Sequence, residues 1–585
     1  MTWATAAVPT AAQKSTRRFM GPPSAHCTGG DRRRTVRVVG FGCQQTAERP
    51  AQRARHSSDF AERGRCAIRA TPKGRQMRTK SLLSMVAVLC AAIGVPGIAH
   101  ASCNEVKAAL ADSINLMDVR CFDSTDLTTN NADTTPANNS VPGLPPGAFT
   151  PVTDRGVISP DPPNRTPIGR AVPGIQVNGR FTDDPTGEAR FLLRLPTVWN
   201  GKLVVAGASG TRSEFNGDFA WSDYVVQKGY AYASQNKGVL NLKITSLSSA
   251  TPPTPNSCRL NPASSVWVEF YDNEPAKAFT QWTEYFIDGT GLAKRAVKAQ
   301  YNSLPQRTYA VGTSNGGYQV RRALEQAPDL FDGGVDWEGT FIDPRGPNIL
   351  IDLPPAIRNW PAYALGLTSS APAVKNAAKI AAQNIEAAGY PPDIVIGTTS
   401  LWGLYWAQFW EVTQCQWQKR FDPNWITYLD GPNDIQGTGG YEYLARAALD
   451  PAIAARLASV ATTGKIGRPL VTVAGTMDAL LPIQRGARAY EALVLAEAHG
   501  GGNDRDGRSV QYRLYEVQNG NHIETFKNTF SQLEFIQKHA QKSFDLLTDY
   551  VERGAPLPQS QCIPKGGAIG TPSNKPGHCA NLLVP

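Results

Sequence analysis

Ser314 is the residue whose surroundings are best suited to chemistry, because it lies in the stretch Gly312-Thr-Ser-Asn-Gly316. This is the pattern G-x-S-x-G, in which glycines allow the sharp strand-to-helix turn that exposes a nucleophilic hydroxyl. A strand-like run precedes it at 307–312, and apolar residues recur at helical spacing from Tyr318 onward. The pattern also occurs in ordinary turns, but in this setting we expect Ser314 to attack an acyl carbonyl.

A serine hydroxyl needs a base, and the base needs a carboxylate that orients it. After residue 101 the chain has four histidines: His499, His522, His539 and His578. His522 follows the strand-like run 512–517 in a loop rich in turn formers, which favours it as the base. We expect a surface helix position for His539 and flexible or glycine-rich surroundings for His499 and His578.

Asp478 is the expected acid, because it directly follows the buried strand-like run 468–475. Parallel sheets collect their functional groups at the carboxyl ends of strands. The order Ser314, Asp478, His522 is also the chain order of the triad in α/β-hydrolases. An Asp in such a place can instead cap a helix, and Asp336 and Glu338 remain alternatives for the acid.

Backbone amides are expected to stabilise the oxyanion that forms on the attacked carbonyl. One is the amide of Asn315, directly after the nucleophile. The others are the amides of Ala208 and Ser209, in the small-residue loop that follows the strand-like run 201–207. The same loop is also compatible with a simple turn.

Strand-like and helix-like segments alternate around these residues. The strand-like runs lie at 174–181, 188–195, 201–207, 307–312, 468–475 and 512–517, and helical stretches lie near 274–300, 318–327 and 532–550. This alternation predicts an α/β fold with a mostly parallel sheet covered on both faces. It breaks between residues 340 and 465, where we expect a large, mainly helical lid insertion.

The three motifs resemble those of the α/β-hydrolase superfamily: Gly-Thr-Ser-Asn-Gly-Gly at 312–317, Gly-Thr-Met-Asp at 475–478 and Gly-Asn-His at 520–522. With its insertion and cysteines, the chain is similar to the branch of secreted tannases and feruloyl esterases. The resemblance implies a serine esterase that works without cofactor or metal. Members of that branch carry linked cysteines beside the catalytic Ser and His, where this chain has Thr313 and Ile523.

The insertion is rich in aromatic residues, among them Trp402, Trp406 and Trp410, and Trp402, Tyr405, Trp406 and Phe409 fall at helical spacing. That spacing is typical of the core of a lid helix. The alternative, which we also carry forward, is that the three tryptophan side chains bind an aromatic or apolar acyl group.

Most of the net charge of +10 belongs to the N-terminal segment. Residues 1–101 hold 17 Lys and Arg against 4 Asp and Glu, about +13, so the remainder is near −3. The main body therefore gives no reason to expect a nucleic-acid partner. Residues 77–101 show a basic start, a short apolar run and Ala99-His100-Ala101, which predict a signal peptide cleaved near Ala101.

An anchor helix or a buried helix is the alternative for 77–101, but the apolar run is short for a bilayer, so we expect no stable membrane anchor. Residues 1–76 are Arg-rich and precede this signal. We expect them to be a non-native extension, with a disordered basic tail or a transit segment as alternatives. The mature chain is then secreted or periplasmic.

Six cysteines follow residue 101, and an even number in an exported chain suggests up to three disulfides with about fifteen possible connectivities. Local pairs, Cys103–Cys121 and Cys562–Cys579, would leave Cys258 with Cys415. The spacing does not suit zinc.

The predicted division is 1–76 extension, 77–101 signal peptide, 102–150 N-terminal segment and linker, 151–339 first core part, 340–465 lid, 466–553 second core part and 554–585 tail.

These features predict a secreted serine esterase that acts by a Ser-His-Asp triad on phenolic or plant-derived esters. The alternatives are a hydrolase of polyester (hydroxyalkanoate) oligomers, a serine peptidase or amidase, and a catalytically silent binding protein of the same fold. The expected partner is a small-molecule or oligomeric ester. The sequence does not determine the oligomeric state.

Overall fold

The computed structural model describes most of the chain after residue 100. The described residues are 101–111, 116–131, 133–134, 166–184, 187, 189–210, 213–238, 243–260, 264–269, 279–425, 439–499 and 511–585. The chain divides into Met1–Ala92 and Ile93–Pro585, and every described residue belongs to the second unit. The predicted extension 1–76, and the predicted signal peptide except Ala101, lie outside the described residues.

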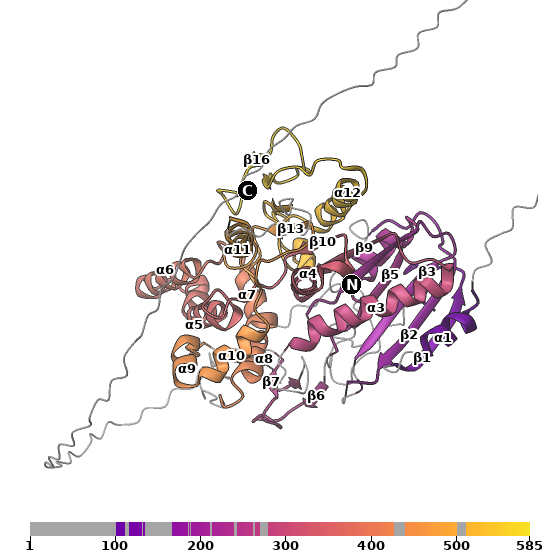
Figure 1. The fold of residues 1–585 in the computed structure, drawn as a ribbon. Coiled ribbons are helices and arrows are strands. Elements are labelled where there is room, and N and C mark those ends of the chain that lie inside the picture. Colours follow the sequence, from indigo (N-terminus) through magenta and orange to yellow (C-terminus); the bar gives the residue numbers. More distant parts are fainter. Residues whose placement is uncertain are drawn as a thin grey trace, which may run out of the picture. The chain divides into compact units, whose positions relative to one another are not determined.

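An eleven-stranded mixed sheet forms the centre of the second unit (Figure 1). Its strands in spatial order are β1 (Leu116–Ser124), β2 (Gly174–Phe181), β3 (Arg190–Pro196), β5 (Ala231–Gln235), β4 (Lys202–Gly207), β9 (Arg307–Thr313), β10 (Gly333–Trp337), β13 (Leu470–Gly475), β14 (Tyr512–Val517), β15 (Gln561–Ile563) and β16 (Lys575–Pro576). The strands from β5 to β15 pair in parallel, and the edge strands β1, β2, β3 and β16 pair antiparallel.

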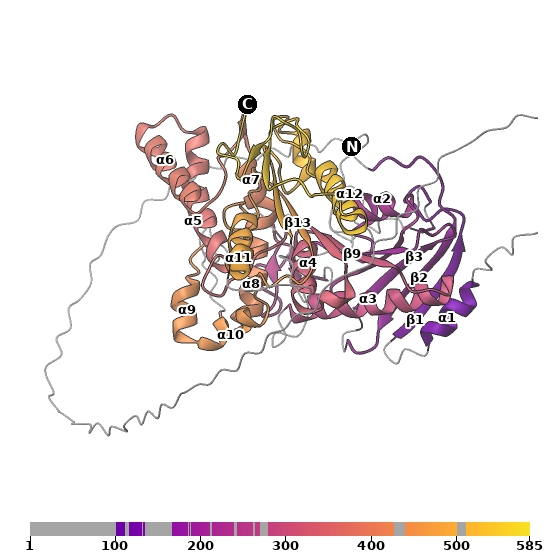
Figure 2. The same cartoon turned by 45° about the horizontal axis from the view of Figure 1, so that its top comes forward.

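Both faces of the parallel strands are buried, which explains why these strands read as continuous apolar runs. Along β4, Leu203 and Val205 pack into the core on one face, while Val204 and Ala206 pack into the core on the other. The helices α3 (Thr280–Tyr301), α4 (Asn315–Gln326) and α11 (Ala487–His499) cover the first face. The short α2 (Asp223–Val226) and α12 (Gln537–Arg553) cover the second (Figures 1 and 2). The predicted α/β fold, a mostly parallel sheet with helices on both faces, is confirmed.

The insertion between β10 and β13 is mainly helical, as predicted. It contains α5 (Ile349–Thr368), α6 (Pro372–Ala387), α7 (Leu401–Tyr405), a π-helical turn (Trp406–Trp410), α8 (Glu411–Phe421), α9 (Tyr443–Leu449), α10 (Pro451–Ser459) and a hairpin of β11 (Val395–Ile396) and β12 (Thr399–Ser400). In both ribbon views these helices lie on the side of the sheet away from β1 and β2. The Cys258–Cys415 disulfide joins α8 to β7 (Cys258–Arg259), in a small sheet with β6 (Lys243–Ser246) and β8 (Trp267–Glu269).

Both ends of the described chain contribute more structure than the sequence suggested. The N-terminal segment supplies the helix α1 (Cys103–Ala111) and the edge strand β1, which the Cys103–Cys121 disulfide links. The tail supplies β15 and β16, and the Cys562–Cys579 disulfide holds this region. The three disulfides are therefore those suggested by local pairing, but 512–517 is not the last strand of the sheet.

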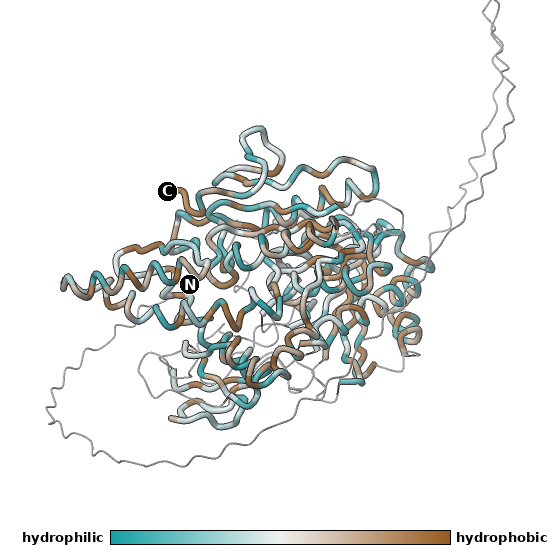
Figure 3. The backbone as a smooth tube through the Cα atoms, turned by 60° about the vertical axis from the view of Figure 1, so that its left-hand side comes forward, coloured by the Kyte–Doolittle hydropathy of each residue, from teal (hydrophilic) through white to brown (hydrophobic). Residues whose placement is uncertain are grey.

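Apolar and hydrophilic stretches alternate along the described chain (Figure 3). Among the described residues, no helix combines the length and the apolar character that crossing a membrane requires.

Candidate active site

Ser314 lies at a sharp turn between β9 and α4, with φ 57° and ψ −122°. A non-glycine residue rarely adopts such a conformation, and strained backbone of this kind clusters at functional sites. The turn is possible because its neighbours lack side chains: a Cβ on Gly312 would lie 2.2 Å from the carbonyl oxygen of Gly316. The amide of Ser314 donates to the carbonyl of Trp337 on β10 (2.8 Å), which ties the turn to the sheet.

The loops after β13 and β14 deliver Asp478 and His522, and they are bonded directly to each other. The amide of Met477 donates to the carbonyl of Gly520 (2.8 Å). The loops approach so closely that a Cβ on Gly475 would lie 2.3 Å from the oxygen of Gly520. This contact sets the spacing between the acid and the base.

The structure brings Ser314, His522 and Asp478 into one chain of hydrogen bonds. Nε2 of His522 lies 3.1 Å from Oγ of Ser314, and its Nδ1 lies 2.7 Å from Oδ2 of Asp478. The other oxygen of Asp478 accepts the amides of Leu480 and Leu481, each at 2.7 Å. Asp478 is almost fully buried and Ser314 is 7% exposed. The arrangement has the geometry of a nucleophile, a base and an orienting acid.

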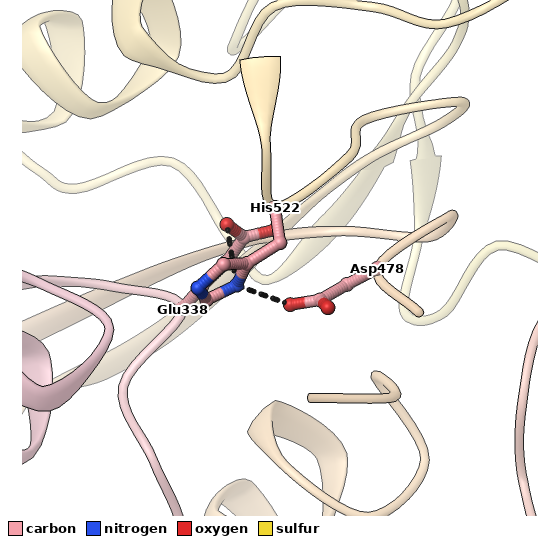
Figure 4. A group of neighbouring side chains, drawn as sticks. All are labelled: Glu338, Asp478 and His522. Atoms are coloured by element: carbon pink, nitrogen blue, oxygen red, sulfur yellow. Dashed lines mark hydrogen bonds and ion pairs between the residues drawn. The ribbon is translucent and has the colours of Figure 1, made fainter. Parts of the chain in front are cut away.

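The two alternatives for the acid have different environments. Asp336 forms a fully buried ion pair with Arg321, so its carboxylate serves the core. Glu338 faces the base: its Oε2 lies 3.5 Å from Nδ1 of His522 (Figure 4). Figure 4 shows Asp478 and Glu338 approaching the same ring nitrogen of His522 from different sides.

Burial is the largest influence on His522, and by itself it lowers the pKa of the imidazole. The charge of Asp478, together with that of Glu338 when Glu338 is ionised, outweighs burial and raises the pKa of His522 to about 9. For Glu338, burial and then the charge of Asp478 raise the pKa well above its usual range. Two carboxyl groups therefore compete for one imidazole in a poorly solvated site.

Within the described residues, Glu338, Asp478 and His522 are also the group whose atoms lie close enough to share a metal ion. The 2.7 Å separation between His522 and Asp478 is that of a direct hydrogen bond. The chemistry of the triad requires neither a metal nor an organic cofactor.

The expected oxyanion donors have different positions. Asn315 is the first residue of α4, where amides lack helical partners and the helix dipole favours negative charge. The loop at Ala208 packs against the turn: a Cβ on Gly316 would lie 2.4 Å from the oxygen of Gly207 and 3.3 Å from the carbonyl carbon of Ala208. The amide of Ser209 instead donates to Oδ1 of Asn216 (2.7 Å). This bond occupies the Ser209 amide and corrects its assignment as an oxyanion donor.

Lys237 is a residue at this loop that sequence reasoning missed. Its side chain is fully buried, and its ammonium donates to the carbonyls of Ala208 (3.2 Å) and Ser209 (3.0 Å). Lysines are rarely buried unless they are paired. Nothing in the local sequence distinguishes this lysine from a surface one, because its partners lie almost thirty residues earlier in the chain.

The lid aromatics divide into packing residues and one partly exposed residue. Trp402 and Trp410 are fully buried in the hydrophobic core of the insertion, which corrects their assignment as substrate-binding residues. Trp406 is only partly buried and packs against Trp360, with ring centroids 5.9 Å apart. The helical spacing of Trp402 and Tyr405, which are both fully buried, reflects core packing, since burial rather than catalysis sets that period.

The lid instead contacts the loops that carry the acid and the base. The indole N–H of Trp410 donates to the carbonyl of Ala479 (2.7 Å), next to Asp478. The hydroxyl of Tyr405 donates to Oδ1 of Asn521 (2.9 Å), next to His522. Sequence reasoning did not find these positioning contacts, because each joins residues about 70 or more positions apart.

Two of the remaining histidines, His578 and His539, have structural surroundings. His578 bonds Oε2 of Glu491 (2.7 Å). His539 is buried in α12, and burial lowers its pKa to about 3, so its expected surface position is wrong. His499 ends α11.

Comparison with known proteins gives a match to part of the chain. The sequence model of the 3HB-oligomer hydrolase family matches residues 436–581, a segment that includes Asp478 and His522 but not Ser314. A D-(-)-3-hydroxybutyrate oligomer hydrolase of Burkholderia thailandensis is 34% identical over 109 residues, which are 18% of this chain and 14% of that protein. The corresponding proteins of Burkholderia mallei and Burkholderia pseudomallei match equally. The match therefore spans a small part of these relatives.

Among solved structures, feruloyl esterase B from Aspergillus oryzae is similar with a TM-score of 0.43 and 13% identity, over 80% of this chain and 93% of that one. Tannin acyl hydrolase from Aspergillus niger is similar with a TM-score of 0.42 and 13% identity, over 81% of this chain and 91% of that one.

Proposed function

We propose that this protein is a serine hydrolase of carboxylic esters, with Ser314 as nucleophile, His522 as general base and acid, and Asp478 as the carboxylate that orients His522. The observation that carries the proposal is the continuous hydrogen-bond chain from Ser314 through His522 to Asp478, at 3.1 and 2.7 Å. The strained backbone at Ser314 supports it, because the turn presents the hydroxyl at the start of α4.

In the proposed reaction, Oγ of Ser314 bonds to the ester carbonyl carbon while Nε2 of His522 takes the hydroxyl proton. The amides of Asn315 and Ala208 stabilise the oxyanion of the tetrahedral intermediate. The C–O bond to the leaving alcohol then breaks, and His522 returns the proton to that oxygen. Water, activated by His522, hydrolyses the acyl-enzyme and regenerates Ser314.

Short hydroxyalkanoate oligomers are the favoured substrates, ahead of the phenolic esters expected from the motifs. The partial match to the 3HB-oligomer hydrolase family supports this order. Such oligomers carry a chain of ester bonds with small apolar side groups. The half-buried Phe409, in the lid, and Ile523, next to His522 in the sequence, offer apolar surface of the kind such groups need.

Export to an oxidising compartment is part of the proposal. The three disulfides of the described chain support it, because disulfides persist in secreted and periplasmic proteins and are rare in the cytosol. Cleavage near Ala101 is the predicted processing step, and sequencing the amino terminus of the exported protein tests it.

The test is covalent labelling with a fluorophosphonate, combined with hydrolysis of a substrate panel. We expect labelling that disappears in Ser314→Ala, and hydrolysis of a 3-hydroxybutyrate trimer with a higher kcat/KM than of methyl ferulate or a peptide anilide. If the wild type does not label, the protein is a binding protein and not a serine hydrolase, and equal labelling after Ser314→Ala would show that Ser314 is not the nucleophile. A preference for ferulate would restore the phenolic substrates.

A further inference from the structure

Glu338 is a buried carboxyl group beside the triad that the proposed mechanism does not use. It follows β10 and has a left-handed backbone conformation, with φ 52°. Its amide donates to the carbonyl of Val473 (2.9 Å), and its Oε1 accepts the amide of Gly475 (2.9 Å). Both bonds are to β13, the strand that delivers Asp478. The same strand therefore holds both carboxyl groups in place.

The second oxygen of Glu338 has no hydrogen-bond partner, although the residue is 97% buried. This oxygen lies 3.5 Å from Nδ1 of His522. An unsatisfied buried carboxyl oxygen is costly, and a left-handed glutamate adds strain. An unpaired buried oxygen and a strained backbone occur together mainly at functional sites. Here the unpaired oxygen faces Nδ1 of His522, the nitrogen that Asp478 already binds.

Two adjacent carboxylates in a buried site cannot both ionise easily. Asp478 receives three hydrogen bonds, from Leu480, Leu481 and His522, whereas Glu338 receives only the amide of Gly475. The carboxyl group with fewer hydrogen-bond donors is the poorer site for a negative charge, so Glu338 is the one that holds a proton in the resting site. A neutral Glu338 also leaves His522 less basic than two charges would, which suits a general base.

We propose that Glu338 is a positioning residue for His522: a neutral carboxylic acid in the resting site that becomes the ionised partner of Nδ1 when Asp478 is absent. This inference rests on the proposed function, since it concerns the same base. Removing Asp478 takes away the charge that keeps Glu338 protonated. Glu338 then loses its proton to solvent and accepts the hydrogen bond from Nδ1 that Asp478 accepted before.

The test compares Asp478→Ala, Glu338→Gln and the double variant by kcat/KM on p-nitrophenyl butyrate across pH. We expect Asp478→Ala to lose about 10²-fold, Glu338→Gln about 10-fold or less, and the double variant about 10⁴-fold, the scale of a base with no orienting carboxylate. The acid limb of the pH profile should also lie at least about one unit lower in the double variant than in Asp478→Ala. The reason is that burial without a carboxylate lowers the pKa of a histidine. A purely structural role for Glu338 would not move this limb.

Asp352→Asn is the matched control, because it removes another buried carboxyl group, in the lid helix α5, that does not bond His522. Combined with Asp478→Ala it should leave the activity and pH profile of Asp478→Ala unchanged. The rate of fluorophosphonate labelling gives the same comparison on folded molecules alone.

The inference is overturned if Asp478→Ala and the double variant have equal activity and equal acid limbs while the wild type still labels at Ser314. If the wild type does not label at all, the proposed function fails first, so the two failures are distinguishable.

Discussion

A variant that breaks the buried ion pair between Arg321 and Asp336 tests whether Asp336 stabilises the fold and takes no part in catalysis. Nε of Arg321 lies 2.6 Å from Oδ2 of Asp336, and both side chains are fully buried. The carboxylate also accepts the hydroxyl of Thr472 (2.8 Å) and the amide of Gly339 (2.7 Å). Asp336→Asn preserves the shape of the side chain but leaves a buried guanidinium without its counter-charge.

Breaking one side of a buried ion pair costs about 3–5 kcal/mol. That is a large share of the roughly 5–15 kcal/mol by which proteins are stable. With a urea m-value of about 3 kcal/mol/M, the unfolding midpoint of Asp336→Asn should fall by about 1–2 M. The folded variant should keep kcat/KM within about threefold, because the bonds of Asp336 go to Arg321, Thr472 and Gly339 and not to His522.

The assay is urea unfolding followed by tryptophan fluorescence, with ester hydrolysis measured below the transition. The control is the double variant Asp336→Asn/Arg321→Met, which removes both charges and should regain part of the lost stability. An unchanged midpoint in Asp336→Asn would refute the assigned cost of the ion pair. A loss of activity of about 10²-fold at an unchanged midpoint would show that Asp336 takes part in catalysis.

Three further predictions concern the turn, the lid and the effect of pH. Gly316→Ala places a Cβ 2.4 Å from the oxygen of Gly207, so labelling and kcat/KM should fall about 10²-fold or more; near-normal labelling would contradict the predicted clash. Trp410→Phe leaves the carbonyl of Ala479 without its hydrogen-bond donor, which should lower the free energy of unfolding in urea by about 1–3 kcal/mol. The variant should also lower kcat more than it changes KM. An unchanged kcat would mean that this hydrogen bond does not position the loop of Asp478. Burial raises the pKa of Asp352 to about 8, so the contribution of this carboxyl group to folding stability is complete below about pH 4 and is lost as the pH rises through 8. Asp352→Asn should therefore raise Tm at pH 8 more than at pH 5. An equal change in Tm at both pH values would contradict the raised pKa.

Most strands of the central sheet could be predicted because their signals are local. The strand-like runs 174–181 and 512–517 coincide with β2 and β14. The short strand β15 escaped detection, since three residues carry no readable period. The nucleophile turn is local too: the glycines at 312 and 316 and the strand before them are contiguous in sequence.

Other features of the site could not be predicted, because they depend on contacts between distant segments. The sequence offered Asp478, Asp336 and Glu338 as acids. In the structure Asp478 bonds His522, Asp336 bonds Arg321, and Glu338 is a second carboxyl group beside the His522 ring. These different roles follow from how β10, β13 and β14 pair.

The sequence by itself therefore determined most of the core strands and helices, the turn at Ser314 and the short list of residues able to act with it. Only the tertiary structure decided that the Ser209 amide is occupied and that Trp402 and Trp410 are buried. The physical reason is range: backbone turns and apolar periods are set by neighbours in the chain, whereas burial, hydrogen-bond partners and pKa values are set by segments that meet only when the sheet and the lid have packed.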